Sequence, residues 1–400
     1  MRTTMSKTFT GSDVNDIYYR AISTIVERGI KTESRNGTVY RQPGTLISHY
    51  HNPQNRMLFA PGRDANPFFH IFESLWMLAG RNDVAFPAHY VPHMKTFSDD
   101  GLTFNGAYGY RWRHAFGMDQ IELIVKELHR NPQSRRVYLQ MWDARLDLQY
   151  GMDGGKDACC NLGAKFEIDD DGRLNMWVNC RSNDMILGGY GANVVHFSFL
   201  QEYIVDRLRA LGSSIEMGFY EQISMNAHVY EKLYPPKLWE GVQKDIAAWE
   251  HEERVDAVVD AYWVSADYLH PSKEGLPYLM TISPILFEGS LSDNPKFKAE
   301  SVAITASAKF DEEVRLITDL SLDKGLQLES PYLKYIVLPM MTAYEFYKAG
   351  ALQEAFDKIH NMRLKIQELF KLQDHIRFDV EYACSKWLER RLEAKKLKEA

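Results

Sequence analysis

The stretch ACCNLGAKFEIDDDGRLNMWVNCRSNDMILGGYGAN, residues 158–193, decides the expected fold of this chain. Two segments rich in strand-forming residues, 164–168 and 174–180, flank the polar turn 169–172, a pattern typical of a β-hairpin. Residues 193–211 follow with the length and apolar content of a long helix. This order of strands and helix predicts an α+β fold.

Helical patterns dominate the chain before this stretch. Residues 12–28 carry an apolar stripe that Gly29 is placed to end, and residues 119–129 are amphipathic. Residues 67–80 are apolar nearly all round, which predicts a buried helix with the carboxylate of Glu73 in its middle. After the amphipathic helix, residues 136–142 favour a strand.

The pattern of the sequence changes near residue 240, where charged helical segments begin to dominate. We predict two portions, an α+β portion covering 1–240 and a mainly helical C-terminal extension covering 241–400. The extension contains charged helical patterns at 245–262 and 342–398, a break near Gly350, and a weak strand pattern at 302–306. The sequence gives no role for the extension.

Composition narrows the class of protein. The 400 residues are 45% hydrophobic, with 47 basic and 54 acidic groups and a net charge of −7, so we expect a folded chain without direct nucleic-acid binding. No apolar run approaches the roughly 20 residues that span a bilayer, and residues 1–10 lack the apolar core of a signal peptide. We expect no membrane contact and a cytoplasmic location.

Four cysteines occur, at positions 159, 160, 180 and 384. The absence of any Cys-x-x-Cys pair argues against a metal site, and four cysteines in 400 residues do not form a disulfide framework. Buried apolar thiols and a nucleophile therefore both stay open.

Several polar motifs have two interpretations each. The adjacent forks of Arg135 and Arg136 suit a phosphate monoester, and Arg181 needs an anionic partner, which could be a ligand or Asp184 in an internal ion pair. The residues at 228 and 230 alternate along an expected strand, so both point to the same face, either as core or as site residues.

The order of these motifs is more informative than any one of them. They are GAYGYRWR (106–113), SRR (134–136), ACCN (158–161), RSND (181–184), Asn193 and HVY (228–230). Over residues 30–235, this series resembles the thymidylate synthase and deoxynucleotide hydroxymethylase family. The resemblance implies a mixed β-sheet packed by helices, and 5,10-methylenetetrahydrofolate as co-substrate without a metal.

The resemblance implies a role for each reacting residue. Cys160 matches the nucleophile that adds to C6 of the pyrimidine, because its spacing to Arg181 exceeds the family's by only one residue. Asn161 follows it where synthases have histidine. Glu73 matches the carboxylate that handles protons and orders water, and Tyr108 matches the tyrosine near the C5 proton.

The phosphate ligands implied by the resemblance come from two subunits. Arg181, with Ser182 beside it, matches a phosphate ligand whose charge lowers the thiol pKa, and Arg35 resembles the early phosphate arginine. In this family the Ser-Arg-Arg arginines reach the neighbouring subunit's phosphate. Arg135 and Arg136 therefore imply a homodimer with shared sites.

The remaining matches concern the sugar, the base and folate. His228 and Tyr230 match the pair that holds the sugar 3′-hydroxyl, and Asp184 matches the aspartate that hydrogen-bonds the pterin. Asn193 offers a donor to uracil O4 and an acceptor to N3–H, which favours dUMP, although the loop before it is one residue longer than in synthases.

The product of the reaction depends on whether water or a hydride adds in its second half. Hydride transfer needs a dry site, closed in synthases by a short C-terminal segment that we cannot find here. The series Cys159-Cys160-Asn161 and the motif at 181–184 look more like the phage-type hydroxymethylases. We therefore favour hydroxymethylation of dUMP, with thymidylate synthesis, dCMP hydroxymethylation and an inactive binding protein as alternatives.

Overall fold

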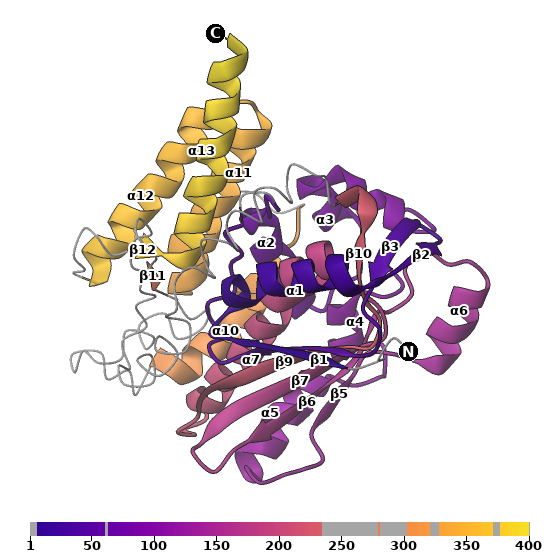
Figure 1. Cartoon of the computed structure of the whole chain (residues 1–400). Helices are drawn as coiled ribbons and strands as arrows, with labels where there is room; N and C mark the ends of the chain where they lie inside the picture. The colour runs from indigo at the N-terminus through magenta and orange to yellow at the C-terminus, as the bar shows by residue number, and fades with distance from the viewer. Residues whose placement is uncertain are drawn as a thin grey trace, which may run out of the picture.

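A six-stranded mixed sheet forms the base of the structure, a computed structural model that describes residues 6–60, 63–233, 279–280, 302–320, 328–370 and 377–399. Its strands, in spatial order, are β1 (Lys7–Gly11), β4 (Leu46–Tyr50), β9 (Glu216–Ser224), β7 (Arg173–Cys180), β6 (Asn161–Ile168) and β5 (Tyr138–Gln140). β1 runs parallel to β4 and β7 parallel to β9, and the other pairs are antiparallel. This confirms the α+β class with a mixed sheet (Figure 1).

A smaller sheet carries residues of the motifs at 181–184 and 228–230. Its order is β2 (Ile30–Ser34), β3 (Gly37–Arg41), β10 (Ala227–Tyr230) and β8 (Asn183–Asp184). β10 and β8 are parallel, and their register sets His228 beside Asp184. A third pair joins β11 (Leu279–Met280) to β12 (Arg377–Phe378).

The predicted helices of the first portion are confirmed. They are α1 (Val14–Arg28), α2 (Pro67–Leu78), α5 (Gln120–Arg130) and α7 (Val194–Ala210). Side-chain oxygens of Asp13, Asn66 and Asp119 accept backbone N–H groups at the starts of α1, α2 and α5, as N-caps do. Shorter helices in this portion are α3 (Ala85–Tyr90), α4 (Tyr108–Arg113), α6 (Gln149–Met152), the 3₁₀ turns Pro92–Phe97 and Glu231–Leu233, and the π-helical turns Ala144–Leu148 and Met185–Asn193.

The hairpin is confirmed, and its turn ends at Gly172, whose φ of +76° favours glycine. The strand expected over 136–142 is shorter, since only Tyr138–Gln140 pair with β6. The strand expected over 302–306 is wrong, because these residues belong to α10 (Val302–Ile317). A helical row of buried residues further along α10, Phe310, Val314 and Ile317, outweighs the strand preference of the first turn.

Most of the described part of the final helical run is confirmed, as α11 (Leu338–Lys348), α12 (Leu352–Phe370) and α13 (Asp379–Glu399). The strand β12 stands between α12 and α13, and the π-helical turn Leu333–Val337 precedes α11. The break falls at Gly350, with φ +81°. The helix expected over 245–262 lies outside the described residues, and the division near residue 240 stays a prediction. No helix in the described part of the chain is long and apolar enough to cross a membrane.

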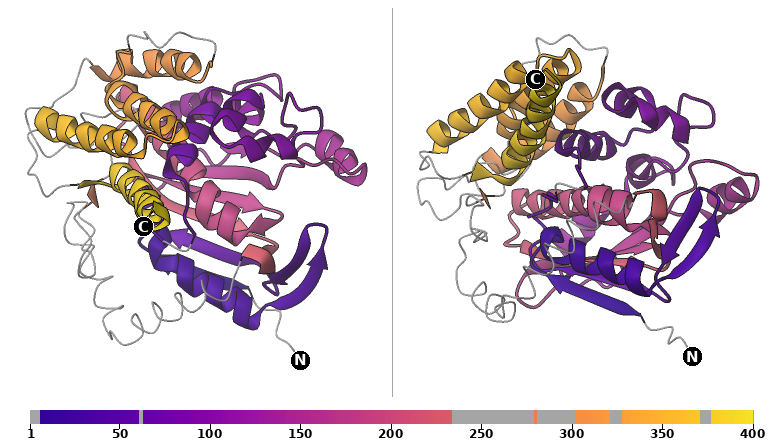
Figure 2. Two further views of the ribbon diagram at one scale, coloured as in Figure 1. Left: turned by 90° about the horizontal axis from the view of Figure 1, so that it is seen from above. Right: turned by 45° about the horizontal axis from the view of Figure 1, so that its top comes forward.

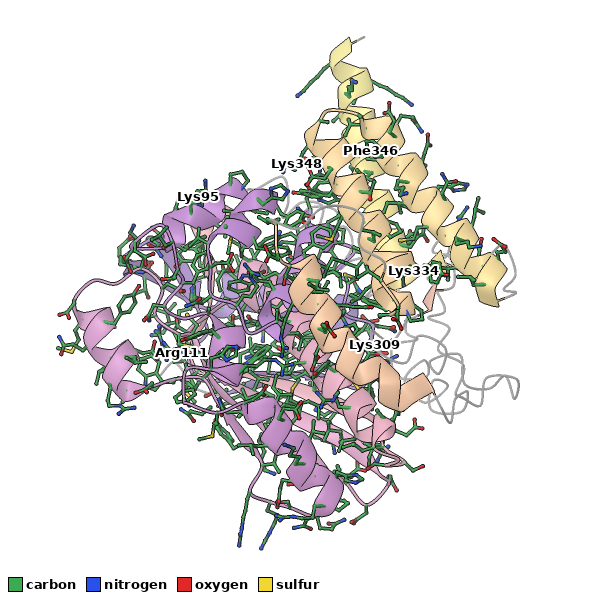
Figure 3. All side chains as sticks on the ribbon, turned by 180° about the vertical axis from the view of Figure 1, so that it is seen from behind. Lys95, Arg111, Lys309, Lys334, Phe346 and Lys348 are labelled. Carbon is green, nitrogen blue, oxygen red and sulfur yellow. The ribbon has the colours of Figure 1, made fainter. Side chains whose placement is uncertain are left out.

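The C-terminal helices pack directly on α2. The ring of Phe68 in α2 lies 5.5 Å from Tyr344 of α11 and 5.6 Å from Trp387 of α13, and α10 contacts both α2 and α7. Figures 1 and 2 show α11 to α13 standing together beside the sheet portion. At the far end of α11, Glu345 lies 2.6 Å from the His89 ring of α3. Lys348, which is labelled in Figure 3, contacts the same ring at 3.2 Å. The extension therefore completes the core around the helix that carries Glu73.

Candidate active site

The two adjacent cysteines occupy different environments. Cys159 is only 2% exposed, and its sulfur faces the carbonyl oxygens of Met141 at 3.7 Å and Gly106 at 3.8 Å. Burial raises the pKa of the Cys159 thiol well above its usual value. Cys160, directly before β6, is partly exposed. Cys160 is therefore the more accessible of the two cysteines.

Arg181 lies beside Cys160. Its Nε donates to the Cys159 carbonyl at 2.8 Å and its Nη2 to the Ala158 carbonyl at 3.1 Å, with Nη2 3.9 Å from the Cys160 sulfur. Its guanidinium also lies over the Trp142 ring, at 5.3 Å from the centroid. These contacts aim the positive charge at the Cys160 segment.

The electrostatics of the Cys160 thiol differ in part from the prediction. Burial raises its pKa overall, while Arg181 and, less strongly, Arg35 act to lower it. Arg35 lies in the turn between β2 and β3, and its Nη1 donates to the Gly155 carbonyl at 3.4 Å. The alternative ion pair of Arg181 with Asp184 is wrong, because no ion pair joins these two described residues.

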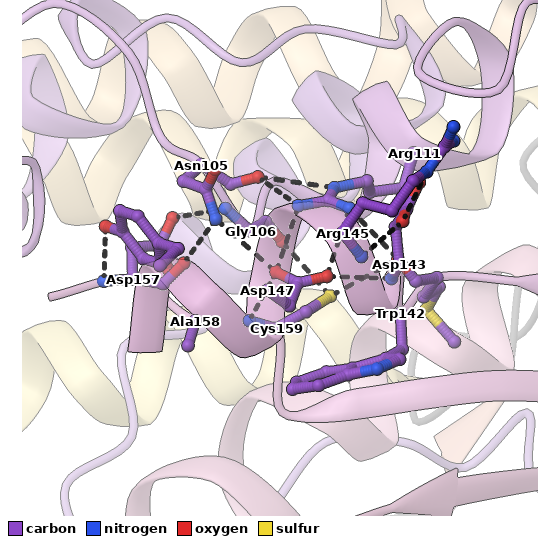
Figure 4. Close-up of polar contacts among 12 residues, drawn as sticks. Asn105, Gly106, Arg111, Trp142, Asp143, Arg145, Asp147, Asp157, Ala158 and Cys159 are labelled. Carbon is purple, nitrogen blue, oxygen red and sulfur yellow. Dashed lines mark hydrogen bonds and ion pairs between the residues drawn. The ribbon is translucent and has the colours of Figure 1, made fainter. Parts of the chain in front are cut away.

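A buried ion pair supports the cysteine segment (Figure 4). Arg111 of α4 binds Asp147 through two parallel contacts of 3.1 Å, and both side chains are at most 2% exposed. The Asp147 carboxylate also accepts the backbone N–H of Asp143 at 2.8 Å and that of Cys159 at 3.4 Å. Sequence reasoning quoted Arg111 only within a motif and missed Asp147, which no local pattern marks.

Tyr108 connects α4 to the start of β6. Its hydroxyl accepts the backbone N–H of Asn161 at 3.2 Å, and burial raises its pKa well above the usual value. The next residue, Gly109, packs so closely on Met77 of α2 that a Cβ would lie 2.0 Å from the Met77 carbonyl oxygen. Asn161 is fully buried and accepts from Gln222 Nε2 at 3.5 Å.

A chain of hydrogen bonds through Asn183 and Ser224 holds the Asn193 side chain. Its Nδ2 donates to Asn183 Oδ1 at 3.2 Å, and Asn183 Nδ2 contacts Ser224 Oγ at 3.0 Å. The π-helical turn Met185–Asn193 leads into α7, and such turns accommodate an inserted residue. The longer loop therefore still places Asn193 at the start of α7.

Asp184, His228 and Tyr230 gather on the smaller sheet. Asp184 Oδ1 accepts the backbone N–H groups of Ile186 at 3.0 Å and Leu187 at 3.4 Å. Burial raises the Asp184 pKa, and His228 opposes this. The rings of His228 and Tyr230 are 5.2 Å apart, which confirms that both point to one face.

Glu73 and His196 meet between α2 and α7. His196 Nε2 lies 3.1 Å from Glu73 Oε2, and the side chains are 5% and 14% exposed, respectively. Sequence reasoning singled out Glu73 and missed His196, although a lone histidine in the apolar run VVHFSF (194–199) was a signal.

The remaining candidates lie at the edges of this group. Ser182 is half-buried between β7 and β8, and its carbonyl faces the Cys180 sulfur at 3.1 Å. Arg135 and Arg136 are exposed before β5, and no described contact joins them to the Cys160 segment of the same chain.

Comparison with known proteins identifies the family. The thymidylate synthase family model matches residues 16–249. The deoxyuridylate hydroxymethyltransferase of Pseudomonas phage M6 is 37% identical over 91% of this chain and 88% of its own length. Proteins of the same name from Bacillus phage SP01 and Delftia phage PhiW-14 are 34% and 28% identical, over 59% and 60% of this chain and 62% and 66% of their own lengths. The chain belongs to the thymidylate synthase family, and within it the chain is similar to phage hydroxymethyltransferases.

Proposed function

We propose that the chain hydroxymethylates dUMP at C5, giving 5-hydroxymethyl-dUMP. The observation that carries this proposal is the orientation of Asn193, whose amide nitrogen is held by Asn183. The second N–H of this amide is left for uracil O4, and its oxygen for N3–H. The names of the phage relatives, deoxyuridylate hydroxymethyltransferase, support the same substrate and product.

The first half of the reaction uses Cys160 as nucleophile. Its thiolate adds to C6 of uracil, and the electrons of the C5–C6 double bond make C5 nucleophilic. Arg181 and Arg35 favour the thiolate, which offsets part of the cost of its burial. Tyr108 of α4, whose hydroxyl reaches the start of β6, assists removal of the C5 proton.

Members of this family use 5,10-methylenetetrahydrofolate, which supplies the one-carbon unit. Asp184 fits such a co-substrate, because the two backbone N–H groups that it binds in the described part of the chain both donate to Oδ1, which leaves Oδ2 for a pterin N–H. Asn161, beside Cys160, completes the set around the reacting carbon. No metal is needed for these steps.

The nucleotide's sugar and phosphate have separate ligands. His228 and Tyr230 hold the 3′-hydroxyl, and Arg181, Ser182 and Arg35 bind the phosphate. Forks of arginine bind phosphate oxygens in pairs, so several arginines suit one phosphate dianion.

A homodimer supplies the last two phosphate ligands, Arg135 and Arg136 of the partner subunit. Aromatic side chains on one face of the large sheet support a dimer. Trp177 and Phe219 are partly exposed with rings 5.0 Å apart, and Tyr138 is 42% exposed. Aromatic side chains exposed together in this way are commonly covered by a partner.

The second half of the reaction adds water to the exocyclic methylene at C5. Glu73 orders this water and accepts its proton. The alternatives are hydride transfer, which gives dTMP, the same reaction on dCMP, and an inactive binding protein.

One incubation separates these outcomes. The full chain is incubated with methylenetetrahydrofolate and either dUMP or dCMP, and the nucleotide products are weighed by mass spectrometry while dihydrofolate is followed by absorbance. We expect 5-hydroxymethyl-dUMP without dihydrofolate. A methylated product with dihydrofolate, turnover of dCMP alone, or no turnover would each contradict the proposal.

The shared site predicts complementation between two inactive variants. Arg136→Ala and Cys160→Ser are each expected to lose activity, because one lacks a phosphate ligand and the other the nucleophile. Mixed after partial unfolding and refolding, they form heterodimers in which one of the two sites receives both native residues. Activity should then return, to about a quarter of the native value if subunits pair at random.

Refolding each variant alone is the control, since neither should regain turnover. Equal activity of the mixture and its separate components would contradict the placement of Arg136 in the partner's site.

A further inference from the structure

Glu73 and His196 form a polar pair inside an apolar helix interface. Nε2 of His196 is 3.1 Å from Oε2 of Glu73, but its geometry gives it no hydrogen-bond partner in the described part of the chain. Buried polar atoms almost always have a partner, so an unpartnered imidazole nitrogen beside a carboxylate points to a third group.

The geometry of the pair suits one water molecule. A water oxygen can accept a hydrogen bond from Nε2–H of His196 and donate one of its own hydrogens to Oε2 of Glu73. One lone pair of the oxygen then stays available for attack. The 14% exposure of Glu73 leaves this side of the pair open.

The pair lies one helical turn from the residue that reads the base. Asn193 has helical φ and ψ of −61° and −41°, so the backbone runs without a break into α7. Residues three apart on a helix share a face, which places His196 beside Asn193. This step rests on the proposed function: if Asn193 holds O4, the neighbouring ring carbon C5 and its methylene point toward His196.

A second contact connects this part of α7 to the nucleophile. The ring of Phe197, next to His196, lies 6.0 Å from the ring of Tyr108. The Tyr108 hydroxyl in turn accepts the backbone N–H of Asn161, directly after Cys160. The first turn of α7 is therefore connected both to Asn193, which holds the base, and to the segment that carries Cys160.

We propose that His196 is the residue that positions the attacking water, with Glu73 as its base. The water oxygen bonds to the exocyclic methylene carbon, Glu73 takes the proton, and the electron pair moves to O4 as an enolate. The enolate then collapses, the C5–C6 double bond re-forms, and the Cys160 sulfur leaves as thiolate. In this way His196 favours the hydroxymethyl product over a methyl product.

His70 provides a matched control from α2. Its ring is 6.3 Å from that of His196, and it is equally buried. Burial, together with Arg63 and His196, lowers the pKa of His70 well below its usual value. No described contact joins its side chain to Glu73, so we expect a change there to affect folding rather than water capture.

The experiment compares the two halves of the reaction. With dUMP tritiated at C5, tritium release reports loss of the C5 proton, and 5-hydroxymethyl-dUMP reports capture by water. A thiol such as 2-mercaptoethanol is added, because it can attack the same methylene carbon and let the enzyme turn over when water cannot. The wild type should give one tritium per hydroxymethyl group.

For His196→Ala we expect the ratio of tritium to hydroxymethyl product to rise to on the order of ten, with the thioether as the balance. His196→Gln keeps an N–H donor and should bring the ratio back toward one. His70→Gln should keep a ratio of one even if both rates fall. A ratio of one for His196→Ala would overturn the role of His196.

These outcomes are separable from failure of the proposed function. If the wild type yields no 5-hydroxymethyl-dUMP, the proposed function is wrong. If the wild type yields it and both His196 variants keep a ratio of one, only the role of His196 is wrong.

Discussion

Replacing Cys160 by serine should lower turnover by roughly 10⁴-fold or more, because the hydroxyl is a far weaker nucleophile toward C6 than a thiolate. The side chain is nearly the same size, so we expect the variant to fold and to bind dUMP. Intact mass after incubation with methylenetetrahydrofolate and 5-fluoro-dUMP measures the effect directly. The C5 fluorine cannot leave as a proton, so the wild type should stall as a covalent adduct that Cys160→Ser does not form.

Cys159→Ser is the control for this result. The Cys159 sulfur is buried against two backbone carbonyls, and a serine hydroxyl can donate its hydrogen to one of them. This variant should keep the adduct and most of its activity. Loss of the adduct in Cys159→Ser and its retention in Cys160→Ser would mean that the neighbouring cysteine is the nucleophile.

The elements whose apolar residues recur at a regular spacing could be predicted from the sequence. The apolar stripe of α1, the continuous apolar run of α2 and the hairpin of β6 and β7 follow local rules, and all three are present. The first turn of α10 could not be predicted locally, because its side-chain preferences favour a strand. Tertiary packing by Phe310 and Val314 of the same helix decides the outcome.

The site was predictable where motifs are continuous in sequence and less so where the fold joins distant segments. The motifs around Cys160, Arg181 and His228 each lie in or next to a single strand. By contrast, the ion pair of Arg111 with Asp147 joins α4 to a π-helical turn that has no pattern of its own. The position of His196 opposite Glu73 depends on how α2 crosses α7, which no local rule supplies.

The role of the extension also emerges only from packing. Trp387 and Tyr344 enclose Phe68 on α2, the helix that carries Glu73. Nothing in the sequence links residues so far apart. The described part of the extension thus packs directly on the helix that carries Glu73.

Asn193→Asp should reverse the choice of base. Uracil presents O4 as an acceptor, which a carboxylate repels, whereas cytosine presents an N4–H donor that a carboxylate accepts. A site that reads a base through paired hydrogen bonds discriminates strongly, so kcat/KM for dUMP should fall by about 10⁴-fold, and that for dCMP should rise above it. Parallel assays with both nucleotides measure the two values, and Asn193→Ala, which reads neither base, is the matched control.

The surrounding amides allow this substitution without an unsatisfied group. At present Asn193 donates to Asn183 Oδ1, and a carboxylate would set two acceptors against each other. A flip of the Asn183 amide turns its Nδ2 toward the new carboxylate, and the Ser224 hydroxyl can then donate to Asn183 Oδ1 at the place where it now accepts. The variant should therefore fold, and a folded variant that still prefers dUMP would show that Asn193 does not read the base.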